Sequence, residues 1–81
     1  MKIDAKIEFN GKAAEELGRS WMRVPVDIDY VHADEAEIRE WVGNELAEAF
    51  GRSISDSCFE ITNMQELVEE INFAEFQDKV N

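Results

Sequence analysis

The stretch VDIDYVHADEAEIREWVGNELAEAF, residues 26–50, decides the fold that the sequence predicts. Asp34 occupies the position of a helix N-cap, and Glu37 follows three residues later with the spacing of a capping box. Gly51 is placed to end this helix as a C-cap. Between these signals the apolar residues recur with a 3.6-residue period, which predicts an amphipathic helix. Its predicted buried stripe consists of Ile38, Trp41, Val42, Leu46, Ala49 and Phe50.

Two strands are predicted before this helix. Apolar and charged residues alternate from Lys2 to Phe9, which is typical of a strand with one buried face. The alternation returns from Met22 onward, where Pro25 lacks a backbone donor and indicates an edge strand or an interruption. The predicted inner face of this second strand consists of Met22, Val24, Val26, Ile28 and Tyr30, with Asp27 and Asp29 on the other face.

The segment between these strands has turn and helix signals. Asn10-Gly11 predicts a turn, and residues 12–20 contain helix formers that stop at Gly18. We expect a short helix or an ordered loop there, with Trp21 packed beneath it.

The last part of the sequence predicts one more strand and one more helix. Residues 58–62 are the expected third strand, and Asn63, with Glu66 three residues later, marks the start of the helix. The apolar stripe of this helix consists of Met64, Leu67, Val68, Ile71 and Ala74. Phe73, Phe76 and Val80 lie off that stripe. The helix therefore either bends near Asn72 or carries a second apolar face.

These elements together predict an α+β fold. The expected order is β-(short α)-β-α-β-α, with a small antiparallel or mixed three-stranded sheet packed against two longer helices. We expect residues 1–81 to form a single compact domain. A domain of this size buries only a modest core, so few apolar residues remain to line a ligand cavity.

Charge is the most unusual property of the composition. Nineteen acidic residues against eight basic ones give a formal net charge of −11, beyond the magnitude of about 2–8 that suits a small soluble domain. Nearly all of the excess follows Val26, since residues 27–48 have a net charge of −7 and residues 53–81 one of −6. Self-repulsion of this charge destabilises the folded state, which indicates that the charge has a use.

Several classes of function are excluded by what the sequence lacks. Cys58 and His32 are the only residues of their types and do not form a catalytic arrangement, so no catalytic residue is predicted. The Asp27-Ile28-Asp29 run lacks the glycine and closing glutamate of a calcium loop, and neither a metal nor a cofactor is expected. A lone cysteine fits a reducing compartment, and the start of the chain resembles neither a signal peptide nor a membrane span. We expect a cytoplasmic protein.

Glutamates on the predicted 34–51 helix point broadly away from its apolar stripe. Glu37, Glu40, Glu45 and Glu48 span about 16 Å at about 1.5 Å per residue. Basic residues at i+4 are scarce, since Glu48 with Arg52 is the only such pair that the exposed glutamates Glu37, Glu40 and Glu48 form. The predicted partner-binding residues are Asp27, Asp29, Asp34, Glu37, Glu40, Glu45, Glu48, Glu66, Glu69 and Glu70.

The expected partner is a basic protein surface. Acidic groups repel phosphate backbones and anionic lipids, which argues against direct binding to nucleic acid or to a membrane. A nucleic-acid-binding protein presents a positively charged surface, which attracts the acidic residues. The sequence leaves open whether the protein is a monomer or a dimer.

The chain combines an acidic strand-helix unit, VDIDYVHADEAEIREWVGNELAEAF, with a second acidic segment, NMQELVEEINFAEF. In these segments, in its small size and in its single cysteine, it resembles the small acidic proteins that bacteriophages make against host defences, anti-CRISPR proteins in particular. The resemblance implies an inhibitor that acts in the host cytoplasm. Such proteins commonly occupy the basic nucleic-acid channel of a CRISPR nuclease or surveillance complex. An alternative hypothesis is a small structural or adaptor subunit that docks through Phe73, Phe76 and Val80, with the acidic residues serving solubility.

Overall fold

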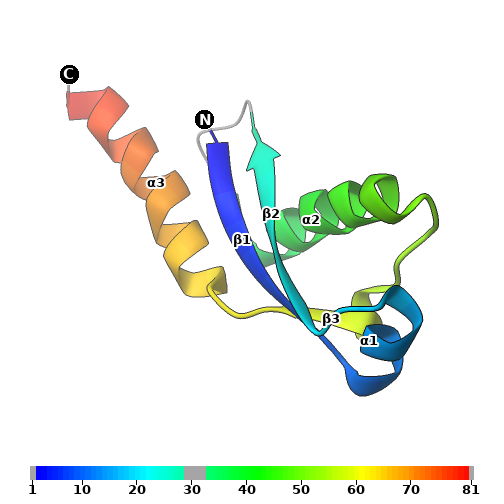
Figure 1. Ribbon diagram of the computed structural model, residues 1–81. Helices are drawn as coiled ribbons and strands as arrows, with labels where there is room; N and C mark the ends of the chain where they lie inside the picture. Colours follow the sequence, from blue (N-terminus) through cyan, green and yellow to red (C-terminus); the bar gives the residue numbers. More distant parts are fainter. Residues whose placement is uncertain (1, 29–32, 81) are drawn as a thin grey trace.

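A computed structural model describes residues 2–28 and 33–80, with side chains as far as Asn72. Its elements are β1 (Lys2–Phe9), α1 (Gly11–Leu17), β2 (Trp21–Asp27), α2 (Glu35–Phe50), a short 3-10 helix η1 (Asp56–Cys58), β3 (Phe59–Ile61) and α3 (Met64–Val80) (Figure 1). This α+β arrangement has the predicted order of strands and helices, and the segment after Asn10 is the short helix rather than a loop.

The sheet has the strand order β2-β1-β3, and both pairings are antiparallel. β2 lies at an edge, as Pro25 indicated, and a proline is tolerated there because its missing N–H takes no ladder bond away. β1 is the central strand, and it pairs along nearly its whole length with β2 but with only three residues of β3. β2 and β3 therefore run in the same direction on either side of β1, linked by α2.

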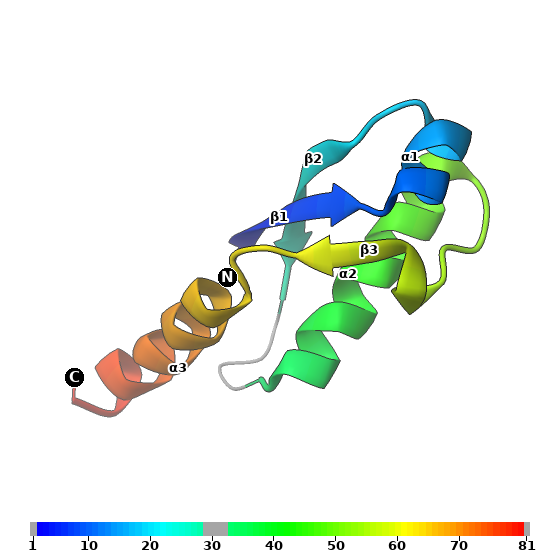
Figure 2. The same ribbon diagram turned by 90° about the horizontal axis from the view of Figure 1, so that it is seen from below.

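One face of the sheet is buried and the other is exposed. Ile3, Ala5, Ile7 and Phe9 of β1 are buried, while the residues between them are exposed, as the alternation predicted. Val24 and Val26 of β2 and Phe59 and Ile61 of β3 complete the buried face. The views in Figures 1 and 2 show α2 lying across this face.

Helix α2 follows its capping signals closely. The Asp34 side chain accepts a hydrogen bond from the Glu37 N–H at 2.9 Å, and Gly51 ends the helix in the left-handed region at φ 67°. Ile38, Val42 and Leu46 are fully buried. The prediction for Ala49 was wrong: it is exposed, because it lies in the last turn of the helix.

Trp21 also differs from the prediction. Its side chain is 64% exposed, whereas we expected it beneath the 12–20 segment. Trp21 is the first residue of β2, and its neighbours Met22 and Val24 take the inward positions, so the alternation directs Trp21 to the exposed face. Ala13 and the half-buried Ala14 and Leu17 supply the contacts between α1 and the core instead.

Helix α3 begins next to the sheet and then projects away from it (Figures 1 and 2). Leu67 and Ile71 are buried, and Met64 and Val68 are half-buried against the core. Ile28 is buried as predicted, although it follows the end of β2. Asp29 and Tyr30 of the predicted second strand lie outside the described residues, as do the side chains of Phe73, Ala74, Phe76 and Val80.

Candidate acidic interface

The main acidic surface lies on helix α2, with three glutamates on the side away from the sheet and a fourth, Glu45, at the flank. Glu37, Glu40 and Glu48 lie more than about 100° from the centre of the buried stripe, at about 100° per residue, and Glu45 lies about 60° from it. All four side chains are exposed. We call these four residues the α2 acidic face. The helix holds their Cα atoms in fixed relative positions.

The α2 acidic face is not neutralised by neighbouring bases. Among the described residues, none of its four side chains forms a hydrogen bond or an ion pair. The sequence had paired Glu48 with Arg52, but Arg52 follows the C-cap Gly51 and is no longer on the helix. Its guanidinium instead lies 3.3 Å from the Glu16 carboxylate of α1. Glu48 is thereby left open to a partner.

Two more acidic residues lie at the start of α2. Asp34 is exposed and uses one carboxylate oxygen to cap the helix, while Glu35 is the exposed first residue of the first turn. Negative side chains here are favoured by the helix dipole, which stabilises this end of the helix by about 0.3–1 kcal/mol for each. Glu35 was not among the predicted partner-binding residues, although its position next to the N-cap was a usable signal.

A groove of about 360 Å³ runs along one side of α2. The small residues Ala36, Gly43 and Ala47 form its helical side, and the segment around Ile54 forms the opposite side. Glu40 and Asp56 both line this groove, one from each side. Carboxylates on both sides of a groove are suited to receive a lysine or arginine side chain. Asp56 was missed because no periodicity in the sequence places the first residue of the short helix η1 against α2.

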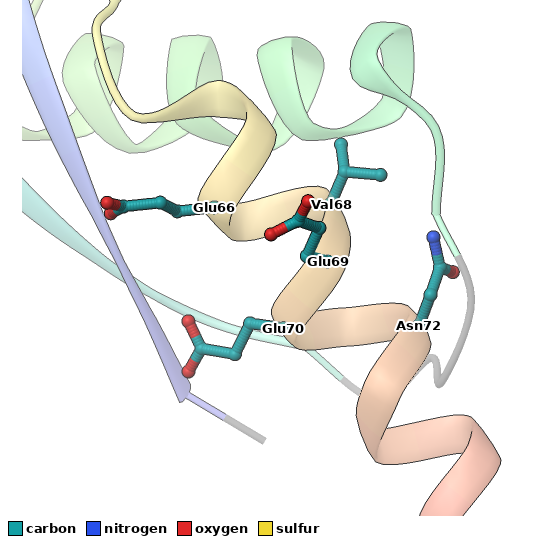
Figure 3. Close-up of a pocket in the computed structure, with 5 residues that line it drawn as sticks. All are labelled: Glu66, Val68, Glu69, Glu70 and Asn72. Atoms are coloured by element: carbon teal, nitrogen blue, oxygen red, sulfur yellow. The ribbon is translucent and has the colours of Figure 1, made fainter.

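The acidic residues of α3 form a separate group. Figure 3 shows Glu66 and Glu70 pointing toward the β1 side of α3, whereas Val68 points toward α2. Glu66, Glu69 and Glu70 are exposed, and the Glu69 carboxylate accepts a long hydrogen bond of 3.5 Å from the Gln65 side chain. With Val68 and Asn72, these glutamates line an open groove of about 740 Å³. Glu66 and Glu70 therefore do not extend the α2 acidic face.

Asp27 lies on a third surface. It is an exposed residue of β2, and its neighbour Val26 points into the core beneath α2. Because successive side chains of a strand point to opposite faces, Asp27 is on the sheet face that α2 does not cover. Asp29 lies outside the described residues. Of the predicted partner-binding residues, the structure thus groups Asp34 with Glu37, Glu40, Glu45 and Glu48.

Across residues 2–28 and 33–72, no three histidine, cysteine, aspartate or glutamate side chains are grouped closely enough to hold a metal ion. Among the described helices, none has the length and the apolar character needed to cross a membrane.

Comparisons with protein-family models, with curated proteins and with solved structures found no match.

Proposed function

We propose that this protein is a non-enzymatic inhibitor that occupies the basic nucleic-acid site of a partner protein in the cytoplasm of a host cell. The observation that carries the proposal is the α2 acidic face, a row of exposed carboxylates on one rigid helix with no base paired to them among the described residues. By resemblance, the partner class is a CRISPR nuclease or surveillance complex and the protein is of phage origin.

The spacing of the carboxylates supports competition with one nucleic-acid strand. Glu37 and Glu48 are eleven residues apart, and at about 1.5 Å per residue the four glutamates supply one charge per about 5.5 Å of the helix axis. One strand of duplex DNA carries a phosphate about every 3.4 Å, and the whole duplex one charge per about 1.7 Å. The α2 row is thus closer in charge density to a single strand than to a duplex.

Charge-assisted hydrogen bonds determine how such a complex is oriented. Lysine and arginine side chains that bind phosphates form equally short contacts with carboxylates. The groove between Glu40 and Asp56 gives one such side chain a defined position. Long-range attraction between the −11 chain and a basic groove raises the association rate, and salt lowers it.

Affinity capture from a bacterial lysate tests this function. The wild-type protein and the Glu40→Lys/Glu48→Lys variant are immobilised, and bound proteins are eluted with a salt gradient. We expect the wild type to retain a nucleic-acid-binding protein that the variant does not, with elution at moderate salt. Retention of the same protein by both, with elution unaffected by salt, would contradict the proposal.

Helix α3 supports a second candidate function. Its C-terminal half projects beyond the sheet and α2 (Figure 1), so a partner has access to it. In this alternative the protein is an adaptor subunit that docks through the last turns of α3. Phe76→Ala is then expected to abolish capture, while Glu40→Lys/Glu48→Lys leaves it intact and added salt changes little.

A further inference from the structure

The face of the sheet that α2 does not cover is exposed and differs chemically from the rest of the protein. Trp21 lies there, and it is the one large hydrophobic side chain that is strongly exposed among the described residues. Among the described residues, the charged residues of this face are Lys2, Asp4, Lys6, Glu8, Arg23, Asp27 and Glu60. Three are bases and four are acids, so the face has a net charge of only −1 in a chain of −11.

Two adjacent rows across this face carry like charges. In the first row Lys6 lies directly opposite Arg23. In the next row Glu8 lies directly opposite Glu60. Like charges in opposite positions of neighbouring strands destabilise a sheet. Within one copy, Arg23 also makes an exposed contact of 3.8 Å with Asp4, which is worth little in water.

The acidic row also contains Trp21, which is the register partner of Glu8. The basic row ends at Thr62, whose N–H bonds to the Lys6 carbonyl at 2.8 Å. From β2 to β3, one row therefore reads Trp21, Glu8, Glu60, and the other reads Arg23, Lys6, Thr62. The basic row carries the cations that the carboxylates and the indole ring of the acidic row can bind.

From this complementarity we propose that a second copy of the chain docks on this face as a two-fold symmetric dimer. The two-fold axis runs parallel to the sheet and perpendicular to its strands, and it passes between the two rows. Each strand then faces its own counterpart, and the basic row of one copy covers the acidic row of the other. Lys6 faces Glu8 of the second copy, and Arg23 faces the ring of Trp21, a favourable cation–π arrangement.

The other in-plane axis is excluded by the same residues. A two-fold axis parallel to the strands leaves each row facing its own equivalent, so Lys6 meets Lys6 and Glu8 meets Glu8. The perpendicular axis instead forms each opposite-charge contact twice, as an isologous interface requires. Aligned face-to-face sheets with crossing angles near about −30° are an ordinary packing of β-structure.

The dimer places the two α2 helices on its outer sides, because α2 packs on the opposite face of each sheet. Both α2 acidic faces stay exposed, far from the dimer contact. The dimer contact uses none of the residues of the α2 acidic face, so the dimer and the proposed function are independent. If both hold, the protein offers a basic partner two equivalent acidic surfaces.

The size of the face determines the strength of the dimer. Because the axis crosses β1 between Lys6 and Glu8, only residues 5–9 of β1 face β1 of the second copy. Five residues at about 3.3 Å each, across three strands at about 4.8 Å spacing, give an area of about 240 Å² per copy. The total of about 480 Å² is small even for weak, transient complexes. The dimer is therefore concentration-dependent, and its detection requires samples up to about 1 mM.

Sedimentation equilibrium with two opposite variants tests the geometry. In Lys6→Glu, positions 6 and 8 of β1 are both acidic in each copy. In Glu8→Lys, the same two positions are both basic. We expect each variant alone to dimerise about tenfold or more weakly than the wild type. An equal mixture of the two is expected to form a heterodimer, because every β1 contact between the rows is then of opposite sign.

Matched controls carry the same charge changes on α1. Lys12→Glu and Glu15→Lys are exposed positions outside the sheet, and we expect both to dimerise like the wild type. A wild type that stays monomeric at about 1 mM would overturn the proposal. So would a dimer that both sheet variants retain, or a mixture no better paired than its components, since the contact would then lie elsewhere.

Discussion

The side chain of Asn63 accepts a hydrogen bond from the backbone N–H of Lys6 at 2.9 Å, although the two residues are far apart in sequence. The same side chain donates to the Asp4 carbonyl at 3.0 Å. β3 contains only three residues, so most of this edge of β1 has no strand beside it. The Asn63 amide continues the ladder past the end of β3, and it sits where α3 begins.

Replacement of Asn63 by alanine tests this contact. Loss of two hydrogen bonds to the β1 backbone is expected to lower the free energy of unfolding by about 1–3 kcal/mol. Asn63→Asp is the control, because a carboxylate still accepts from Lys6 but no longer donates to Asp4. In urea denaturation, the free energy of unfolding should be highest for the wild type, intermediate for Asn63→Asp and lowest for Asn63→Ala. An alanine variant as stable as the wild type would show that the contact is unimportant.

Replacement of Gly43 is expected to raise the stability of the protein rather than lower it. It lies inside α2 with ordinary helical geometry, and an added Cβ would be 3.9 Å from the ring of Phe59, a normal packing distance. Gly43→Ala is therefore expected to raise the free energy of unfolding by about 0.5–1 kcal/mol through helix propensity. Gly51→Ala is the matched control, and it is expected to destabilise because its φ of 67° disfavours a side chain. A loss of stability in Gly43→Ala would mean that α2 is more tightly packed there.

The excess charge predicts how stability depends on salt. With a net charge of −11, repulsion between acids outweighs the exposed ion pairs of Arg23 and Arg52. The urea midpoint should therefore rise as sodium chloride is added from low ionic strength, because the repulsion is screened. Glu40→Gln/Glu48→Gln should raise the midpoint at low salt and weaken the salt response. A midpoint that falls with salt would show that attractive pairs dominate instead.

The two tryptophans should differ in exposure to solvent. Trp21 is strongly exposed and Trp41 is half-buried. In the single-tryptophan variants Trp41→Phe and Trp21→Phe, acrylamide should quench the Trp21 fluorescence more strongly than that of Trp41. The comparison is made at low protein concentration, where the protein is monomeric and the dimer contact does not shield Trp21. Equal quenching would place Trp21 under the α1 segment, as the sequence had predicted.

The sequence predicted the elements whose signals are local. The capping pair Asp34 and Glu37, together with the C-cap Gly51, places α2 correctly because caps and period act within one helix. Pro25 placed β2 at an edge for an equally local reason, its missing donor. These signals were enough to predict the order of strands and helices.

The errors concern contacts between distant segments. Asn63 marked the start of α3 correctly, but the bonds of its side chain to β1 are a contact that no local pattern reveals. Arg52 was assigned to Glu48 by spacing and instead contacts Glu16 from another helix. The sequence left open whether the acids of the two long helices share one face, since the directions of α2 and α3 are set by packing.

A competition titration tests the central claim most directly. The nucleic-acid-binding protein recovered by capture is loaded with a fluorescent single-stranded oligonucleotide, and the wild-type protein is titrated against it. Glu40→Lys/Glu48→Lys is compared with Glu15→Lys/Glu69→Lys, which changes the net charge equally but leaves the α2 acidic face intact. We predict that the wild type and the second variant displace the oligonucleotide and that the first variant does not. Equal displacement by all three proteins, or none by the wild type, would contradict the proposal that the α2 acidic face takes the place of nucleic acid.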